Sequence, residues 1–264
     1  MGAQNAIRRD IITMAYGAGA PHIGSALSVA DILYTLYFKV ANITPENIDS
    51  PNRDRVILSK GHASAALYAT LYEKGILSKQ QIDAYEKDGA EGALPGHIDM
   101  RSAKGLDASA GSLAHGLSIA AGFACADRLD GRSPMNYVIC GDGEMNEGSN
   151  WEAIAYIGSK LLVNVALIVD FNGYQASAAS SADIIDQSNL AERLNAFGLD
   201  AVDIDGHDPD ALAAALRRHS DRPLAIVAHT KKGKGVSFLE DTYQSHYVKL
   251  DKAQYAQAMK ELEG

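Results

Sequence analysis

Cysteine is scarce in this 264-residue chain, which contains only Cys125 and Cys140, both inside apolar runs. Neither lies in a C-x-x-C pair or in a Cys/His array, so a disulfide framework and a zinc site are excluded, and we expect buried free thiols in a reducing cytoplasm. The longest apolar run that we identify, residues 117–126, is too short to cross a bilayer. No apolar stretch follows a basic start, so no secretory signal is predicted.

Positive charge is also in short supply. The chain has 24 basic and 33 acidic residues, a net charge of −9, and these residues are spread without a basic block. Binding to nucleic acid or to an anionic membrane is therefore not expected. Repeats, low-complexity tracts and linker-like segments are missing as well. With 47% hydrophobic residues, the sequence predicts one domain over residues 1–264.

The most informative stretch is residues 136–175. An apolar, β-prone run at 137–140 breaks at Gly141-Asp142-Gly143, and a helical pattern covers 148–161. A second apolar run at 165–169 ends just before Asn172. The periods and lengths predict a βαβ unit whose polar residues follow the carboxyl ends of its strands, where open parallel sheets bind ligands.

The rest of the chain alternates in the same way. Helical patterns cover residues 3–18, 78–87, 115–130, 190–197 and 209–219. Another helix is expected to begin at Ser28, because a serine followed three residues later by the acidic Asp31 resembles a capping box. Residues 53–64 are predicted to form a short strand, a glycine turn and the beginning of a helix, and further strands are predicted at 201–204 and at 224–229. We therefore predict an α/β fold: a doubly wound, mainly parallel sheet with helices on both faces.

The residue types around Asp142 predict a magnesium-diphosphate site. Asp142 offers a carboxylate oxygen and Asn172 an amide oxygen, and Mg²⁺ takes few protein ligands, completing its octahedron with water and phosphate oxygens. The glycines on either side of Asp142 let the backbone approach a bulky anion, and the helix starting near Gly148 presents its amino end to it. The alternative is an ordinary strand-turn-helix in which Asp142 only caps.

The segment from Gly141 to Asn172 resembles the thiamine-diphosphate-binding motif, and its details resemble the amino-terminal part of transketolase. The resemblance implies that Asp142, Asn172 and the backbone carbonyl of Tyr174 hold Mg²⁺, for which Ca²⁺ or Mn²⁺ can substitute. It also implies that Gly143 lies against the diphosphate. The implied cofactor is thiamine diphosphate, and the implied fold is the family's diphosphate-binding domain.

Other segments extend the resemblance along nearly the whole chain. RDRVILSKGHAS implies that His62 reaches the cofactor diphosphate, and LPGH implies that His97 lines the substrate channel. A turn after the first helix implies a substrate contact for His22, which could otherwise be an ordinary loop histidine. His246, after TKKGKGVSFLED, is implied to lie close to both cofactor and substrate, although Tyr247 replaces the usual glycine.

The segment ASAGSLA resembles the part of the family that contacts the aminopyrimidine ring through backbone groups. Gly111, Ser112 and Leu113 are the matching positions, with Ser112 in place of a proline. Glu147 matches a glutamate at the contact between the two halves of the enzyme, where it is linked to cofactor activation; a solvated glutamate at a helix start is the alternative.

The resemblance ends at Gly264, before the pyrimidine-binding and carboxy-terminal domains of transketolases. It therefore implies the N-terminal subunit of a split, cytoplasmic transketolase that requires a C-terminal subunit, in an α2β2 heterotetramer. The implied reaction transfers a two-carbon ketol unit from a ketose, phosphorylated or otherwise anionic, to an aldose. The histidines would hydrogen-bond sugar hydroxyls and shuttle protons.

Three other functions remain open at this point. The chain could be the α-type subunit of a 2-oxo-acid dehydrogenase, a protein like deoxyxylulose-phosphate synthase, or a non-catalytic cofactor-binding subunit. Residues 231–236 lack the spacing of a P-loop, which is rejected. Residues 177–188 form either a loop that becomes ordered over cofactor or partner, or a plain surface loop.

Overall fold

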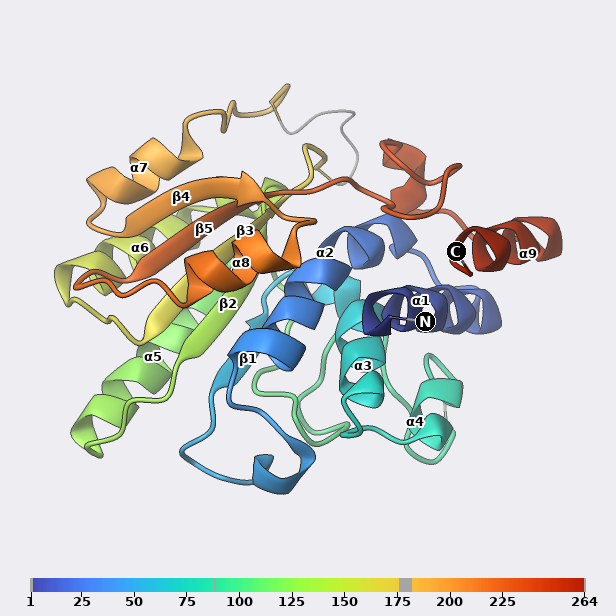
Figure 1. Ribbon diagram of the computed structural model, residues 1–264, viewed down its shortest axis with the longest axis horizontal. Coiled ribbons are helices and arrows are strands. Elements are labelled where there is room, and N and C mark those ends of the chain that lie inside the picture. Colours follow the sequence, from blue (N-terminus) through green and yellow to red (C-terminus); the bar gives the residue numbers. More distant parts are fainter. Residues whose placement is uncertain (1, 88, 176–181, 264) are drawn as a thin grey trace.

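The computed structural model describes residues 2–87, 89–175 and 182–263. Its centre is a five-stranded sheet in the order β1-β2-β3-β5-β4, with every neighbouring pair parallel (Figure 1). The strands are β1 Arg55–Leu58, β2 Asn136–Gly141, β3 Val165–Phe171, β4 Asp200–Asp205 and β5 Leu224–His229. The predicted α/β fold with a parallel sheet is confirmed.

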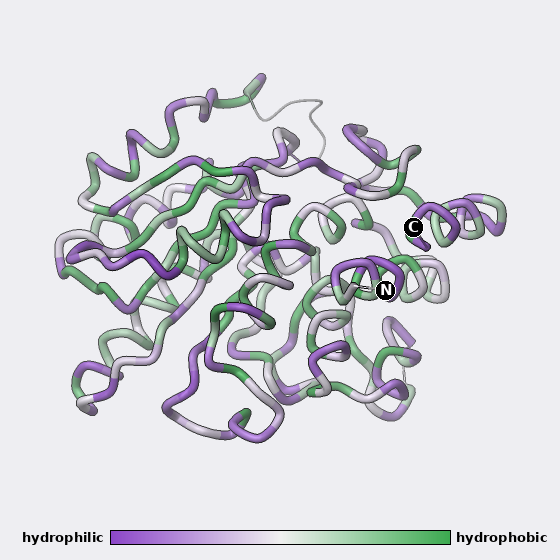
Figure 2. Tube along the Cα trace, in the orientation of Figure 1, coloured by the Kyte–Doolittle hydropathy of each residue, from purple (hydrophilic) through white to green (hydrophobic). Residues whose placement is uncertain are grey.

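The inner strands are apolar on both faces because helices cover both. In β2, Tyr137 and Ile139 pack into one hydrophobic cluster, whereas Val138 and Cys140 pack into the other. The hydropathy trace shows the same strands as hydrophobic segments inside the molecule (Figure 2). Burial on both faces explains why these strands read as continuous apolar runs instead of an alternation.

Two groups of helices form the outer layers. Helices α1, α2, α3, α4, α8 and α9 contribute to one cluster, and α5, α6 and α7 to the other. Their bounds are α1 Ala3–Ala18, α2 Ile23–Thr35, α3 Ser64–Glu73, α4 Lys79–Asp83, α5 Gly116–Leu129, α6 Gly148–Ser159, α7 Leu190–Ala196, α8 Pro209–Leu216 and α9 Lys252–Glu261. Helix α9 packs beside α1, so both ends of the described chain lie on the same side (Figure 1).

Three predicted helix boundaries are wrong, one of them the end of α8, which lies at Leu216 and not at residue 219. Helix α2 begins at Ile23, after His22 in a left-handed conformation, and Ser28 lies inside it. The Ser28 hydroxyl is buried and bonds to Asp170 of β3 (2.6 Å), so it serves a tertiary contact and not a cap. Helix α4 ends at Asp83, since the chain turns at Glu86, which has a φ of 51°.

One apolar helical segment was not singled out from the sequence. The continuous helical segment Ile23–Val40, formed by α2 and the π-turn Leu36–Val40, is long and apolar enough by length and composition to cross a membrane. However, 78% of this segment is buried inside the protein. Packing of a core helix therefore accounts for its apolar character.

Candidate functional site

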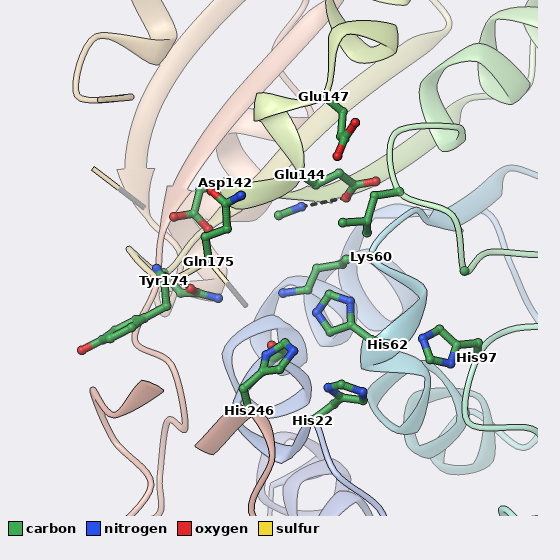
Figure 3. Close-up of a pocket in the computed structure, with 16 residues that line it drawn as sticks. His22, Lys60, His62, His97, Asp142, Glu144, Glu147, Tyr174, Gln175 and His246 are labelled. Atoms are coloured by element: carbon green, nitrogen blue, oxygen red, sulfur yellow. Dashed lines mark hydrogen bonds between the residues drawn. The ribbon is translucent and has the colours of Figure 1, made fainter. Parts of the chain in front are cut away.

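A cavity of about 260 Å³ lies at the carboxyl edge of the sheet, beyond β1, β2 and β3 (Figure 3). Because the strands are parallel, the segments that follow them converge at this one edge. The residues around the cavity come from the GDG, SKGH, PGH and ASAGSLA segments, from residues 144–147, from the loop after β3, from the start of α2 and the turn before it, and from the turn before α9. They are His22, Ser25, Lys60, His62, His97, Gly111, Leu113, Gly141, Asp142, Gly143, Glu144, Glu147, Asn172, Tyr174, Gln175 and His246.

Asp142 and Asn172 lie next to each other, as predicted. Strands β2 and β3 pair up to Gly141, so the two side chains follow neighbouring strand ends. Asp142 Oδ2 accepts the N–H of Gly173 (3.0 Å), and Asn172 Oδ1 accepts the N–H of Tyr174 (3.1 Å). Both side chains are buried, so their oxygens are held in place at the wall of the cavity.

The turn at Gly143 packs closely against Gln175, and its backbone borders the cavity. A Cβ atom at Gly143 would lie 2.9 Å from Cγ of Gln175, so a side chain would not fit without movement. Gln175 Oε1 accepts a hydrogen bond from Asn146 (2.7 Å), and Gln187 donates to both Asn146 Oδ1 (2.5 Å) and the carbonyl of Asp142 (3.3 Å). These bonds fix the turn from outside while its backbone faces the cavity.

Two buried lysines, which the sequence analysis missed, lie near this end of the cavity, together with the carboxylates of Asp142 and Asp170. Lys60 Nζ pairs with Asp170 Oδ2 (2.5 Å). The ammonium of Lys232, a residue that is only 1% exposed, lies 5.1 Å from the centre of the Tyr174 ring. Burial and the charge of Lys60 lower the pKa of Lys232 to about 8. A charged group in this position favours an anionic ligand.

Four predicted site histidines form one cluster (Figure 3). The ring centre of His22 lies 4.6 Å from that of His246, 5.4 Å from that of His62 and 6.0 Å from that of His97. A hydrogen bond from the His22 N–H to the carbonyl of His246 (2.7 Å) joins the turn before α2 to the 3₁₀ turn Tyr243–His246. Among the described residues, Nδ1 of His22 and Nδ1 of His246 are buried without a hydrogen-bond partner.

Three of the clustered histidines, His22, His62 and His246, have lowered pKa values and are neutral at neutral pH. Burial, together with His97 and Lys232, lowers the pKa of His22 to about 4. Burial, Lys232, His22 and Lys60 lower the pKa of His246 to about 3. The pKa of His62 is also lowered, chiefly by burial. Neutral imidazoles can accept or donate hydrogen bonds, and a bound anion would favour their protonation.

Glu144 is a further residue that the sequence analysis missed. Its carboxylate accepts hydrogen bonds from the Ser59 hydroxyl (2.5 Å), the N–H of Ala114 (2.7 Å) and the N–H of Gly141 (3.0 Å). Burial raises its pKa, although these hydrogen bonds act in the opposite direction. Glu144 thereby joins three segments that border the cavity.

The remaining predicted residues lie at the open side of the cavity. Gly111 and Leu113 line it, whereas Ser112 is exposed and is not among the lining residues. Glu147 lines the cavity at the residue before α6 and is exposed (Figure 3). Of the loop predicted at residues 177–188, residues 177–181 lie outside the described residues.

The chain resembles known proteins along almost its whole length. The family model described as "Transketolase, thiamine diphosphate binding domain" matches residues 2–263. Over 262 residues the chain is 37% identical to the 6-deoxy-6-sulfo-D-fructose transketolase subunit SqwG of Clostridium sp. (strain MSTE9), covering 98% of this chain and 94% of that protein. It is 33% identical to a subunit of the apulose-4-phosphate transketolase of Phocaeicola vulgatus, covering 97% of this chain and 90% of that subunit.

Longer relatives match over a smaller part of their length. The chain is 34% identical to human transketolase, covering 98% of this chain and 41% of that protein. The crystal structure of transketolase from Campylobacter jejuni superposes with a TM-score of 0.87 at 30% identity, covering 99% of this chain and 42% of that one. The chain thus spans about two fifths of these transketolases and nearly all of the proteins that are named as subunits.

Proposed function

This chain belongs to the transketolase family, because it matches the family's thiamine-diphosphate-binding domain, and we propose that it is the N-terminal subunit of a split transketolase. The observation that supports a split enzyme is the match to 94% of a protein named as a transketolase subunit, against 41% of human transketolase. We therefore expect a separate chain to supply the pyrimidine-binding domain.

The cavity fits magnesium and a diphosphate. The oxygens of Asp142 and Asn172 and the carbonyl of Tyr174 would hold Mg²⁺, which favours a small number of hard oxygen ligands. The side chains of Lys60, His62 and Lys232 would surround the diphosphate. The fit rests on three features: buried oxygens at two strand ends, a turn at Gly143 without a side chain, and two buried ammonium groups.

The chemistry is shared between cofactor and protein. When bound, thiamine diphosphate supplies a carbanion that makes and breaks carbon–carbon bonds next to a carbonyl. The rings of His22, His97 and His246 would bind the hydroxyls of the sugar and hold or accept their protons. The unpartnered Nδ1 atoms of His22 and His246 are available for such contacts. Glu147, at the open side, would contact the partner.

We propose that the donor is a ketose with an anionic group at its far end. The relatives with high coverage are named for a sulfonated ketose and for a sugar phosphate. Of the described residues, Lys60 and Lys232 would face the diphosphate, and His22, His97 and His246 would face the sugar. The partner would therefore supply the groups that bind the anionic end of the sugar.

Reconstitution with a partner tests this proposal. The isolated chain with thiamine diphosphate and Mg²⁺ should show no ketol transfer, whereas mixing it with a separately expressed chain carrying the pyrimidine-binding domain should restore turnover between a ketose and an aldose. Full activity from the lone chain would contradict a split enzyme. Decarboxylation of pyruvate without sugar transfer would favour a 2-oxo-acid dehydrogenase subunit, and inactivity in every pairing would favour a binding subunit.

A further inference from the structure

A buried polar network outside the cavity connects α1 and α2 to the loop that follows β5. At its centre is Asp31 of α2, whose side chain is 3% exposed. Its carboxylate accepts hydrogen bonds from Arg8 (2.5 Å), from Gln4 (2.8 Å) and from Nδ1 of His207 (2.7 Å). Burial acts to raise the pKa of Asp31, but the bonds from His207 and Arg8 hold it below its usual value.

The other ring nitrogen of His207 binds the backbone. Nε2 accepts the N–H of Lys231 at 2.7 Å. One imidazole makes both contacts when Nδ1 carries the proton and Nε2 is the acceptor, so the carboxylate of Asp31 selects the tautomer that holds Lys231. The two loops approach closely, because a Cβ atom at Gly206 would lie only 2.5 Å from Cγ2 of Thr230.

Lys231 immediately precedes Lys232, the buried lysine beside the cavity. Backbone hydrogen bonds also hold the next part of this loop: the N–H of Gly233 donates to the carbonyl of Gly24 (3.0 Å), and the carbonyl of Lys232 accepts from Asp241 (3.0 Å). Arg8 packs against the end of the loop: a Cβ atom added at Gly235 would lie 3.2 Å from Cδ of Arg8. On the amino side of Lys232 the backbone is held by the His207 bond to Lys231 and, one residue earlier, by the N–H of Thr230, which donates to the carbonyl of Phe171 (3.0 Å).

We propose that His207 is a positioning residue: held by Asp31, it fixes the backbone at Lys231 and so keeps the ammonium of Lys232 aimed at the diphosphate site. The alternative is a purely structural network that stabilises the fold without affecting the site. This inference rests on the anion site of the proposed function and assigns His207 no contact with substrate or cofactor.

Two substitutions separate the two contacts of the ring. In His207→Asn the amide nitrogen can replace Nδ1 at Asp31, but nothing reaches Lys231. In His207→Gln the amide oxygen can replace Nε2 and accept the Lys231 N–H, while the bond to Asp31 is lost. His229→Asn is the matched control, because His229 makes a bond of the same length to Asp203 (2.7 Å) at a half-exposed site.

The measurement is binding of inorganic pyrophosphate with Mg²⁺ to the full chain, by calorimetry. We expect His207→Asn to bind about three- to tenfold more weakly, the effect of one lost hydrogen bond, with His207→Gln and His229→Asn close to wild type. Combined with Lys232→Met, His207→Asn should have no further effect, because it acts through Lys232. Equal losses in both His207 variants, an unaltered His207→Asn, or additivity with Lys232→Met would overturn the proposal.

A measurement on the wild-type chain covers the case in which His207→Asn does not fold. Hydrogen exchange of the Lys231 amide should slow when pyrophosphate binds, since the anion then anchors the adjoining side chain; an unchanged rate would overturn the proposal. These outcomes are independent of ketol transfer. If the variants behave as expected but no partner restores turnover, the split-enzyme proposal fails and the proposal for His207 stands. If a partner restores turnover but the variants do not behave as expected, the proposal for His207 fails and the split-enzyme proposal stands.

Discussion

At the scale of single residues, Asp142 is the side chain on which the proposed cation binding depends. Asp142→Ala removes a carboxylate oxygen from the site, so we expect Mg²⁺-dependent affinity for thiamine diphosphate to fall by at least about 100-fold, the upper range for residues that only support metal ligands. Calorimetric titration measures this. Asp203→Ala, in β4 at a half-exposed site, is the control and should bind normally. Retained affinity in Asp142→Ala would refute the assignment.

The histidine cluster predicts a dependence of stability on pH. The folded-state pKa values of His22 and His246, about 4 and about 3, lie below the value of 6.5 in the unfolded chain. Between these values the unfolded state binds more protons, so the free energy of unfolding falls as pH falls from about 6.5 to about 4. Urea unfolding at pH 7, 5.5 and 4.5 should show a smaller fall in a His22→Asn/His246→Asn double variant. An equal fall would show that these histidines do not titrate as stated.

Glu144→Gln tests the three hydrogen bonds at the buried carboxylate. An amide NH₂ would face at least one of the N–H groups of Ala114 and Gly141, which leaves a buried donor unsatisfied and costs about 1–3 kcal/mol of unfolding free energy. Chemical denaturation measures the change. Glu152→Gln, at an exposed position of α6, should have almost no effect. Equal stability of the two variants would mean that the carboxylate is not required.

The sequence predicted the site residues that lie in compact local motifs. Asp142 and Asn172 could be paired because both follow apolar runs, and parallel strands bring their carboxyl ends together. Lys60 and Glu144 were missed, although Lys60 lies in the segment RDRVILSKGHAS and Glu144 directly follows Gly141-Asp142-Gly143. Their partners are distant in sequence: Lys60 pairs with Asp170, and Glu144 with Ser59 and Ala114. No local pattern gives such pairings.

At the scale of elements, periodicity located every strand and most helices, but it failed at boundaries set by tertiary contacts. Ser28 has the residue type of a helix cap, yet its hydroxyl bonds to Asp170 in the core, and α2 begins earlier, at Ile23. His22, whose backbone has a left-handed conformation, precedes the helix, and its side chain lines the cavity. The requirement for that turn comes from the site and could not be read from propensity.

The contact between α2 and the 3₁₀ turn Tyr243–His246 gives a prediction at this scale. A Cβ atom at Gly24 would lie 2.1 Å from Oγ and 2.8 Å from Cβ of Ser245. Gly24→Ala should therefore displace the turn that carries His246, lower the unfolding free energy by about 1–3 kcal/mol and reduce turnover of the reconstituted enzyme. Thermal denaturation and steady-state kinetics measure these effects.

Gly17→Ala is the matched control for this packing prediction. Gly17 lies in α1, and a Cβ atom at this position would have no neighbouring atom within 4 Å, so alanine should raise stability by about 0.5–1 kcal/mol. The opposite signs of the two substitutions distinguish close packing from helix propensity. A stabilising Gly24→Ala would show that the turn is free to move.

At the scale of the whole molecule, the open side of the cavity is the surface at which we expect the partner subunit to dock. Gly111 and Ser112 are exposed beside the lining residue Leu113, and Glu147 is exposed on the same cavity. In the proposed heterotetramer these positions would face the partner. We expect Ser112→Trp to leave the lone chain folded, because exposed substitutions change stability little, but to block docking through its bulk.

The mass of the reconstituted particle and its turnover measure this effect. Wild-type subunits should form a particle with two copies of each chain, whereas Ser112→Trp should remain unassembled and inactive while keeping its affinity for pyrophosphate and Mg²⁺. The control is Ala253→Trp at an exposed position of α9, beside α1, which should assemble normally. Normal assembly of Ser112→Trp would place the partner elsewhere. The proposal places anion binding on this chain and closure of the cavity on the other, so the two properties should separate in this variant.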